Sequence, residues 1–218
     1  VLILLYFLIY TVGTQFKNLG LVYFCNYVLG TYNDGKTQTM LSVIGGIPMG
    51  LGIFIVWPLA KKFGKRNLTI AGFALYSIGS AICWICPTNM VTVLIGQFIK
   101  NIGGLPCSYV FMALFADVLD HLEYKHNFRC DGIAMSVYNI IAVTSVGIVT
   151  GLFNALLSKS GYIAPSIVNG ETAAAIQSAA TKNAITFSFV GLETITAVIL
   201  IVILAFLSVE KYIDKEQA

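Results

Sequence analysis

The apolar residues of this chain gather into long stretches, and the charged residues are mostly confined to the segments between them. Residues 38–60, 68–99 and 132–158 contain no Asp, Glu, Lys or Arg. A helix needs about 20 mainly apolar residues to cross the hydrocarbon core of a bilayer, where its backbone groups must pair with one another. A membrane β-barrel would instead alternate apolar and polar residues, and a run such as 199–204 does not alternate. The pattern therefore predicts membrane-spanning helices.

Turn-forming residues divide these stretches into six predicted spans. We expect the spans to cover residues 1–30, 37–60, 68–86, 89–118, 132–158 and 183–209. Segments 32–35, 63–66 and 87–89 supply the Gly, Asn, Asp and Pro residues that interrupt helices. The connection 159–182 is the one long loop, and its Ala-rich part predicts a short surface helix near 173–180. The predicted fold class is an all-α integral membrane protein with six transmembrane helices.

The composition agrees with a membrane protein and narrows the functions to consider. The chain is 57% hydrophobic and 11% charged, with a mean hydropathy of +0.83, whereas a soluble domain carries about 25% charged residues. A net charge of only +3 gives no indication of a nucleic-acid partner. The five cysteines are scattered, mostly in apolar runs, so we expect no disulfide framework. With no initiator Met or basic leader, the chain is predicted to be part of a longer protein.

The basic residues predict how the spans are oriented in a cell membrane. Lys and Arg are enriched on the cytoplasmic side of membrane proteins. One set of helix ends carries eight of them, namely Lys61, Lys62, Lys65, Arg66, Lys125, Arg129, Lys211 and Lys215. The opposite ends carry three, namely Lys36, Lys159 and Lys182. We therefore expect loops 61–67 and 119–131 and the C-terminal tail to be cytoplasmic.

Three charged residues fall near the middle of predicted spans and need a partner or water. They are Lys17, Lys100 and Glu193. A charge at the bilayer centre costs at least about 2.5–3.5 kcal/mol on insertion scales. The sequence predicts that these side chains face a hydrated cavity or pair with one another. For Glu193, whose span is otherwise apolar, we expect a structural ion pair.

Polar residues beside these lysines favour a cavity between the spans. Gln97, Lys100 and Asn101 recur at intervals of three or four residues, so they share one helix face. The hypothesis is a mid-depth cavity formed by spans one, two, four and five, with the polar lining Lys17, Asn18, Gln97, Lys100, Asn101 and Asn139. The alternative is that these groups only join neighbouring helices by hydrogen bonds, which is common in membrane bundles.

Two pairs of glycines predict close contacts between helices. Gly46 and Gly50, and likewise Gly147 and Gly151, stand four residues apart. This spacing lets helix backbones approach one another. Segment 45–48, with two glycines and a proline, could instead mark a bend in the second span.

The segment after the fourth span resembles a known family. It carries Ala116, Asp117, Asp120, Glu123, Lys125, Arg129, Asp131 and Gly132. This resembles the pattern A-D-x-x-D-x-x-E-x-K-x-G-x-R-x-E-G of the glycoside–pentoside–hexuronide:cation symporters, a branch of the major facilitator superfamily that includes melibiose carriers. Asn127 stands where the family has Gly, and Asp131 where it has Glu. Segments 17–30, 58–66 and 161–162 are similar to the family's seventh helix, its loop between helices eight and nine, and the region after helix eleven.

The resemblance covers nearly the whole chain and implies an architecture and a function. The six spans would be helices seven to twelve, the C-terminal half of a twelve-helix carrier whose N-terminal half is absent from residues 1–218. Family members take up sugars with a cation by alternating access, and the substrate lies between the two halves. The implied partners are the lipid bilayer, a sugar, the other half and Na⁺ or H⁺, with no organic cofactor. A homodimer formed through the exposed partner-facing surface is a further option.

Two details refine this expectation. Two lysines in one cavity would favour an anionic sugar such as a uronide. A family lysine on helix eleven helps to couple the cation, and the aligned position here is Val143. This departure concerns the coupling of the cation rather than the sugar.

The charged segments at the predicted cytoplasmic ends suggest a gate. The acidic and basic residues that would form it are Asp117, Asp120, Glu123, Lys125, Arg129, Lys61, Lys62, Lys65 and Arg66. Such groups can pair when the inner mouth closes and separate when it opens. The alternative is a solvated charged loop. We also expect Asp131 to cap the fifth span.

Enzymatic and metal sites are poorly supported by the sequence. His121 and His126 are five residues apart, whereas zincins place their histidines four apart on a helix. Cys83 and Cys86 form a single pair, and structural zinc needs four ligands. We predict neither a metal site nor an enzyme. The runner-up functions are a carrier for lysolipids or other amphiphiles and, behind it, a membrane scaffold without transport activity.

Overall fold

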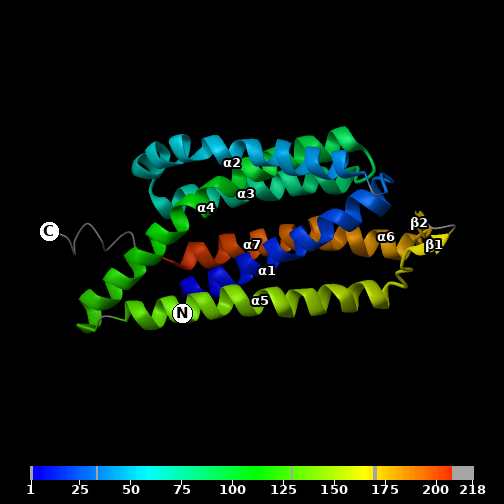
Figure 1. The fold of residues 1–218 in the computed structure, drawn as a ribbon. Coiled ribbons are helices and arrows are strands. Elements are labelled where there is room, and N and C mark those ends of the chain that lie inside the picture. Colours follow the sequence, from blue (N-terminus) through cyan, green and yellow to red (C-terminus); the bar gives the residue numbers. More distant parts are fainter. Residues whose placement is uncertain (1, 33, 129, 169–170, 208–218) are drawn as a thin grey trace.

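The computed structural model describes residues 2–32, 34–128, 130–168 and 171–207, and it is a bundle of long helices with a small hairpin at one end (Figure 1). The helices are α1 (Leu2–Tyr23), α2 (Gly35–Phe63), α3 (Lys65–Ile85), α4 (Met90–His126), α5 (Asp131–Lys159), α6 (Ala179–Thr186) and α7 (Leu192–Phe206). Two π-helical turns, η1 (Phe24–Val28) and η2 (Phe187–Gly191), continue α1 and join α6 to α7. The antiparallel strands β1 (Ser166–Val168) and β2 (Glu171–Ala173) form the hairpin.

The predicted fold class is confirmed. Within the described residues, six helical segments are long and apolar enough to cross a bilayer, namely Leu2–Val28, Gly35–Phe63, Lys65–Ile85, Met90–His126, Asp131–Lys159 and Ala179–Phe206. This helical architecture is that of a multi-pass membrane protein. Figure 1 shows α2, α3 and α4 on one side of the bundle and α1, α5 and α7 on the other.

The fourth span is longer than predicted, because residues 119–126 are helical and not part of a loop. Leu119 and Leu122 pack against the apolar cluster formed by α1, α3, α4 and α7, which gives the extra turns an apolar anchor. The helix ends where Asn127 adopts a left-handed conformation with φ of 51° and its N–H donates to the carbonyl of Glu123. Asparagine is one of the few residues that tolerate this conformation.

The predicted surface helix near 173–180 is wrong. That segment begins with β2, and the helix starts only at Ala179, after Ser178 caps it by accepting from the N–H of Thr181. The side chain of Gln177 joins the two ends of the connection. Its Oε1 accepts from the N–H of Ile163 at 3.1 Å, and its Nε2 donates to the carbonyl of Ile163 at 2.6 Å. These bonds to a residue 14 positions earlier hold Gln177 outside the helix that the alanines favour.

The predicted cap of the fifth span is also wrong. Cys130 occupies the N-cap position and makes no side-chain capping bond, while Asp131 is the first helical residue. Its negative charge still stands in the first turn, where the positive end of the helix dipole favours it. The caps of α2 and α4 are more regular, because Asp34 and Asn89 accept from backbone N–H groups two residues later.

Helices α3 and α4 meet through glycines, but not through those predicted. A Cβ at Gly79 would lie 2.5 Å from the backbone nitrogen of Lys100, and a Cβ at Gly72 would lie 2.6 Å from the carbonyl oxygen of Gly103. By contrast, a Cβ at any of the four glycines predicted to mediate contacts (Gly46, Gly50, Gly147 and Gly151) would meet nothing within 4 Å. Spacing identifies a smooth helix face but not the face that another helix covers.

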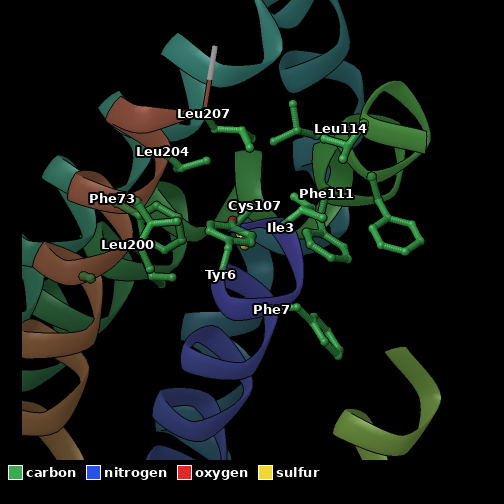
Figure 2. Close-up of a cluster of buried hydrophobic side chains, with 14 residues drawn as sticks. Ile3, Tyr6, Phe7, Phe73, Cys107, Phe111, Leu114, Leu200, Leu204 and Leu207 are labelled. Atoms are coloured by element: carbon green, nitrogen blue, oxygen red, sulfur yellow. The ribbon is translucent and has the colours of Figure 1, made fainter. Parts of the chain in front are cut away.

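Aromatic side chains fill the core where α1 meets α3, α4 and α7 (Figure 2). Tyr6 is 1% exposed, stacks on Phe111 with ring centroids 5.6 Å apart and meets Phe73 edge-on. Its hydroxyl lies 2.9 Å from the sulfur of Cys107, so its polar end is also satisfied. This cluster fixes α1 against α4 and thereby positions the polar residues that lie further along both helices.

Adding one methyl group to a glycine tests the α3–α4 contact. We expect Gly79→Ala to destabilise the protein by about 1–3 kcal/mol, because the backbone of α4 cannot yield as a side chain would. Gly147→Ala is the matched control. It should leave stability unchanged or slightly raised, because a Cβ at this helical position meets no atom within 4 Å and alanine favours a helix more than glycine does. Thermal midpoints of the detergent-solubilised variants measure both, and equal shifts would contradict the packing described here.

Candidate functional site

A cavity of about 210 Å³ opens between α1, α2, α4 and the π-helical turn η2. Its lining residues are Lys17, Asn18, Leu21, Leu41, Ser42, Gly46, Gln97, Asn101 and Phe189. The lining thus combines a cation, three amides and a hydroxyl with apolar and aromatic surface. The structure brings together four of the six residues predicted for a substrate cavity.

Gln97 is the polar group of the cavity that most clearly lacks a partner. The residue is 3% exposed, and its side-chain nitrogen Nε2 is a buried donor with no hydrogen-bond partner among the residues that the structure describes. Leaving such a donor unsatisfied costs about 1–3 kcal/mol. Asn101, one helical turn later, donates its own amide N–H to the backbone carbonyl of Gln97 at 2.9 Å. An acceptor brought by a ligand would satisfy Gln97.

Lys17 brings a positive charge to the cavity. Its side chain is half-buried, and it has no ion-pair partner within the described part of the chain. None of the residues that line the described cavity is acidic, and Lys17 is the one basic side chain among them.

Lys100 does not line the cavity but forms a buried ion pair with Glu193. The two residues are 0% and 1% exposed, and the ammonium of Lys100 donates to one carboxylate oxygen of Glu193. The hydroxyl of Tyr76 donates to the other oxygen. The ion pair expected for Glu193 is therefore present, and it joins α3, α4 and α7.

The ring of Phe189 lies beside both this ion pair and the cavity. The nitrogen of Lys100 lies 5.2 Å from the ring centroid of Phe189 and 5.6 Å from that of Tyr76. Phe189 also lines the cavity and stacks on Phe24, with centroids 4.5 Å apart. The sequence analysis missed both Tyr76 and Phe189, because an aromatic residue within an apolar span carries no signal of its neighbours.

Asn139 lies apart from the other predicted cavity residues. It is exposed on α5 and is not among the lining residues, which come from α1, α2, α4 and η2. Helix α5 packs mainly on α1 and leaves its outer face open. The sequence predicts that the fifth span contributes to the cavity. In the structure η2, which belongs to the sixth span, lines the cavity instead.

The residues predicted for a gate fall into two groups. Lys65 and Asp117 form an ion pair with a nitrogen–oxygen distance of 2.6 Å, which ties α3 to α4. Arg66 donates from Nε to the carbonyl of Leu204 at 2.6 Å and from Nη2 to that of Ala205, which ties α3 to the end of α7. These contacts lie within the bundle.

The remaining gate residues stand at its surface. Lys61 and Lys62 lie over the rings of Trp57 and Phe63, at 5.4 and 5.3 Å from the centroids. On the last turns of α4, Asp120 and Lys125 are exposed and Glu123 is half-buried. Arg129 lies outside the described residues.

Six apolar helical segments and a cavity with polar side chains define the described residues as a membrane-type helical bundle. The family described as MFS/sugar transport protein matches residues 1–211, so the chain belongs to this family of the major facilitator superfamily. This agrees with the resemblance found in the motif at residues 116–132. Members similar to this chain are transporters, not enzymes.

Three relatives illustrate the range of the family. An isoprimeverose transporter of Lactiplantibacillus pentosus is 28% identical over 207 residues, which are 93% of this chain and 40% of that protein. A putative sulfoquinovose importer of Escherichia coli (strain K12) is 26% identical over 153 residues, or 69% of this chain and 31% of the relative. A raffinose carrier protein of Pediococcus pentosaceus is 28% identical over 173 residues, or 77% of this chain and 26% of the relative. The chain therefore spans less than half the length of these relatives.

The buried ion pair makes a stability prediction. Glu193→Gln alone should destabilise the protein by about 3–5 kcal/mol, because it leaves the ammonium of Lys100 buried without a counter-charge. The double variant Lys100→Met/Glu193→Gln removes both charges and should recover most of this loss. Thermal unfolding in detergent measures both variants. If the double variant were as unstable as the single one, the ion pair would not be the source of the effect.

Proposed function

We propose that this chain is the C-terminal half of a secondary transporter that takes up sugars or glycosides with a cation by alternating access. The observation that carries the proposal is the cavity with the unsatisfied amide of Gln97, in a chain of the MFS/sugar transport family. The names of the relatives favour sugars over the amphiphile alternative. The N-terminal half would lie outside residues 1–218.

The cavity lining suits a sugar. Sugar hydroxyls both donate and accept hydrogen bonds, so they can satisfy the donor of Gln97 and pair with Asn18, Asn101 and Ser42. The ring of Phe189 offers an apolar surface for the C–H groups of a sugar ring. The volume of about 210 Å³ is below the range of about 300–1,000 Å³ of complete small-molecule sites. A site completed by a second half explains this difference.

The proposal includes an anionic sugar, whose negative charge would be bound by one lysine of the cavity. Glu193 neutralises Lys100, which leaves Lys17 as the cation that faces the cavity. A carboxylate or sulfonate on the substrate would supply the missing counter-charge. The name of the putative sulfoquinovose importer, a relative of this chain, supports a sugar that carries an acidic group.

The coupling ion, Na⁺ or H⁺, would bind mainly outside this half. The carboxylate of Glu193 already holds Lys100 and Tyr76, and Val143 occupies the position of the family's coupling lysine. Neither position therefore offers a vacant carboxylate or a coupling cation toward the cavity. Acidic residues of the other half are the natural site for the ion.

The exposed charges at the end of α2 and on the last turns of α4 would meet the other half when the inner mouth closes. We assign the exposed Asp120, Lys125 and Lys62 to this contact, together with Glu123 and Arg129 of the same charged segment, while Lys65, Asp117 and Arg66 hold the bundle together behind them. Lys61, which lines a separate cavity between α2 and α4, is not assigned to this contact. The basic loop 61–67, segment 119–131 and the tail would then face the cytoplasm. A homodimer of this bundle through the same surface is the alternative assembly.

Uptake into proteoliposomes by the full-length transporter tests this function. We expect a Na⁺ or H⁺ gradient to drive accumulation of a neutral glycoside, a pentoside or a uronide. Gln97→Leu should raise the half-saturation concentration about tenfold, because one hydrogen bond to the substrate is lost. Gln15→Leu is the control, because it makes the same change at a glutamine of α1 that does not line the cavity. Absence of any sugar movement would refute the proposal.

A second variant tests the charge of the substrate. Lys17→Gln should weaken uronide uptake about 10- to 100-fold, the value of a hydrogen bond to a charged group, and change neutral-sugar uptake far less. Lys36→Gln, an exposed lysine at the start of α2, should affect neither substrate. The half-saturation concentrations of both substrates are measured side by side. Equal losses for the two would show that Lys17 does not recognise the acidic group.

A further inference from the structure

A second cavity, of about 240 Å³, lies between α2 and α4 at the end where α2 gives way to α3. Its lining residues are Trp57, Ala60, Lys61, Lys65, Tyr109, Val110 and Ala113. It shares none of them with the candidate transport cavity. The lining is apolar apart from the two lysines and the hydroxyl of Tyr109, which donates to the backbone carbonyl of Met49. Few polar groups are therefore left for a sugar.

The position of this cavity is that of a membrane–water interface. Four basic residues stand within six positions where α2 ends, namely Lys61, Lys62, Lys65 and Arg66. Charged residues of this kind end a membrane span, and tryptophan is enriched at the same depth. The neighbouring surface of α2 is apolar and open, with Phe54 76% exposed and Trp57 58% exposed. The cavity therefore opens beside an exposed apolar surface and under a basic rim.

Two of the four basic charges are already matched within the bundle. Lys65 pairs with Asp117, and Arg66 donates to carbonyl groups at the end of α7. Lys61 and Lys62 are exposed and lie over aromatic rings, an attraction that leaves their positive charge in place. Neither has an acidic partner in the part of the chain that the structure describes. Of these two lysines only Lys61 lines the cavity, so one positive charge at its rim has no acidic partner within the described residues.

We propose that this cavity binds an anionic phospholipid, with an acyl chain against Trp57 and Val110 and the phosphate on Lys61. Apolar walls and a basic rim match the two parts of such a molecule. Basic pockets between transmembrane helices are suited to anionic headgroups, which a zwitterionic lipid satisfies less well because its own cation opposes the lysines. The bound lipid would bridge α2 and α4 beside the Lys65–Asp117 ion pair. This site stands whether or not the substrate is a sugar.

Trp57 is itself the probe for this lipid. The full-length transporter is reconstituted with phosphatidylglycerol or phosphatidylcholine that is brominated on its acyl chains, which quenches nearby tryptophan fluorescence. The difference between the unmodified protein and Trp57→Phe isolates the signal of Trp57. We expect brominated phosphatidylglycerol to quench it at a mole fraction at least about fivefold lower than brominated phosphatidylcholine, the contribution of one lysine near a lipid surface.

The lysine at the rim provides the matched comparison. Lys61→Gln should reduce the preference for phosphatidylglycerol about fivefold, whereas Lys36→Gln, at the other end of the same helix, should keep it. Both side chains are exposed, so neither change disturbs the core. Equal quenching by the two lipids would reveal only bulk lipid contact and overturn the proposal. Absence of quenching by either lipid would show that protein covers this face, which overturns it as well.

Discussion

The structure depends on one buried ion pair, between Lys100 and Glu193. Charges at mid-depth in a bilayer are costly unless they are paired and hydrogen-bonded, and here the hydroxyl of Tyr76 completes the carboxylate's bonds. The pair draws together three helices that are far apart in sequence. The glycine contact between α3 and α4 is part of the same arrangement, because Gly79 faces the backbone of Lys100 itself.

This pairing also separates the roles of the two lysines. Since Glu193 neutralises Lys100, the cavity is left with the charge of Lys17 and the unsatisfied amide of Gln97. One lysine holds the bundle together, and the other is available to a ligand. The ring of Phe189 contacts both environments, because it lines the cavity and lies beside the ammonium of Lys100.

Sequence reasoning predicted the parts of this structure that depend on composition and spacing. Six spans, the breaks near Gly64 and Asn89, and the shared face of Gln97 and Asn101 all follow from local patterns. The partners of the charges do not, because Tyr76 could be recognised as a ligand of Glu193 only once α3 and α7 were side by side. Which helix faces are covered is likewise set by tertiary packing.

The same limit explains the errors in detail. A charged motif favours a loop, yet the segment after Val118 stays helical because its leucines reach the apolar core. The alanines before Ala179 favour a helix, yet Gln177 folds back on Ile163 and delays it. In both places a contact with residues distant in the chain outweighed the local preference.

The length of α4 has a mechanical consequence. Its 37 residues span about 55 Å at 1.5 Å per residue, well beyond the about 30 Å of a hydrocarbon core. Its last turns extend past the neighbouring helices in Figure 1, while Gln97 and Asn101 lie at the cavity on the same continuous helix. Pro106 stands between the cavity residues and that outer end, and a proline inside a helix removes one backbone hydrogen bond and favours bending there. A tilt imposed on the outer end of α4 by its contacts outside the membrane is therefore transmitted to the cavity through a helix that can bend at Pro106.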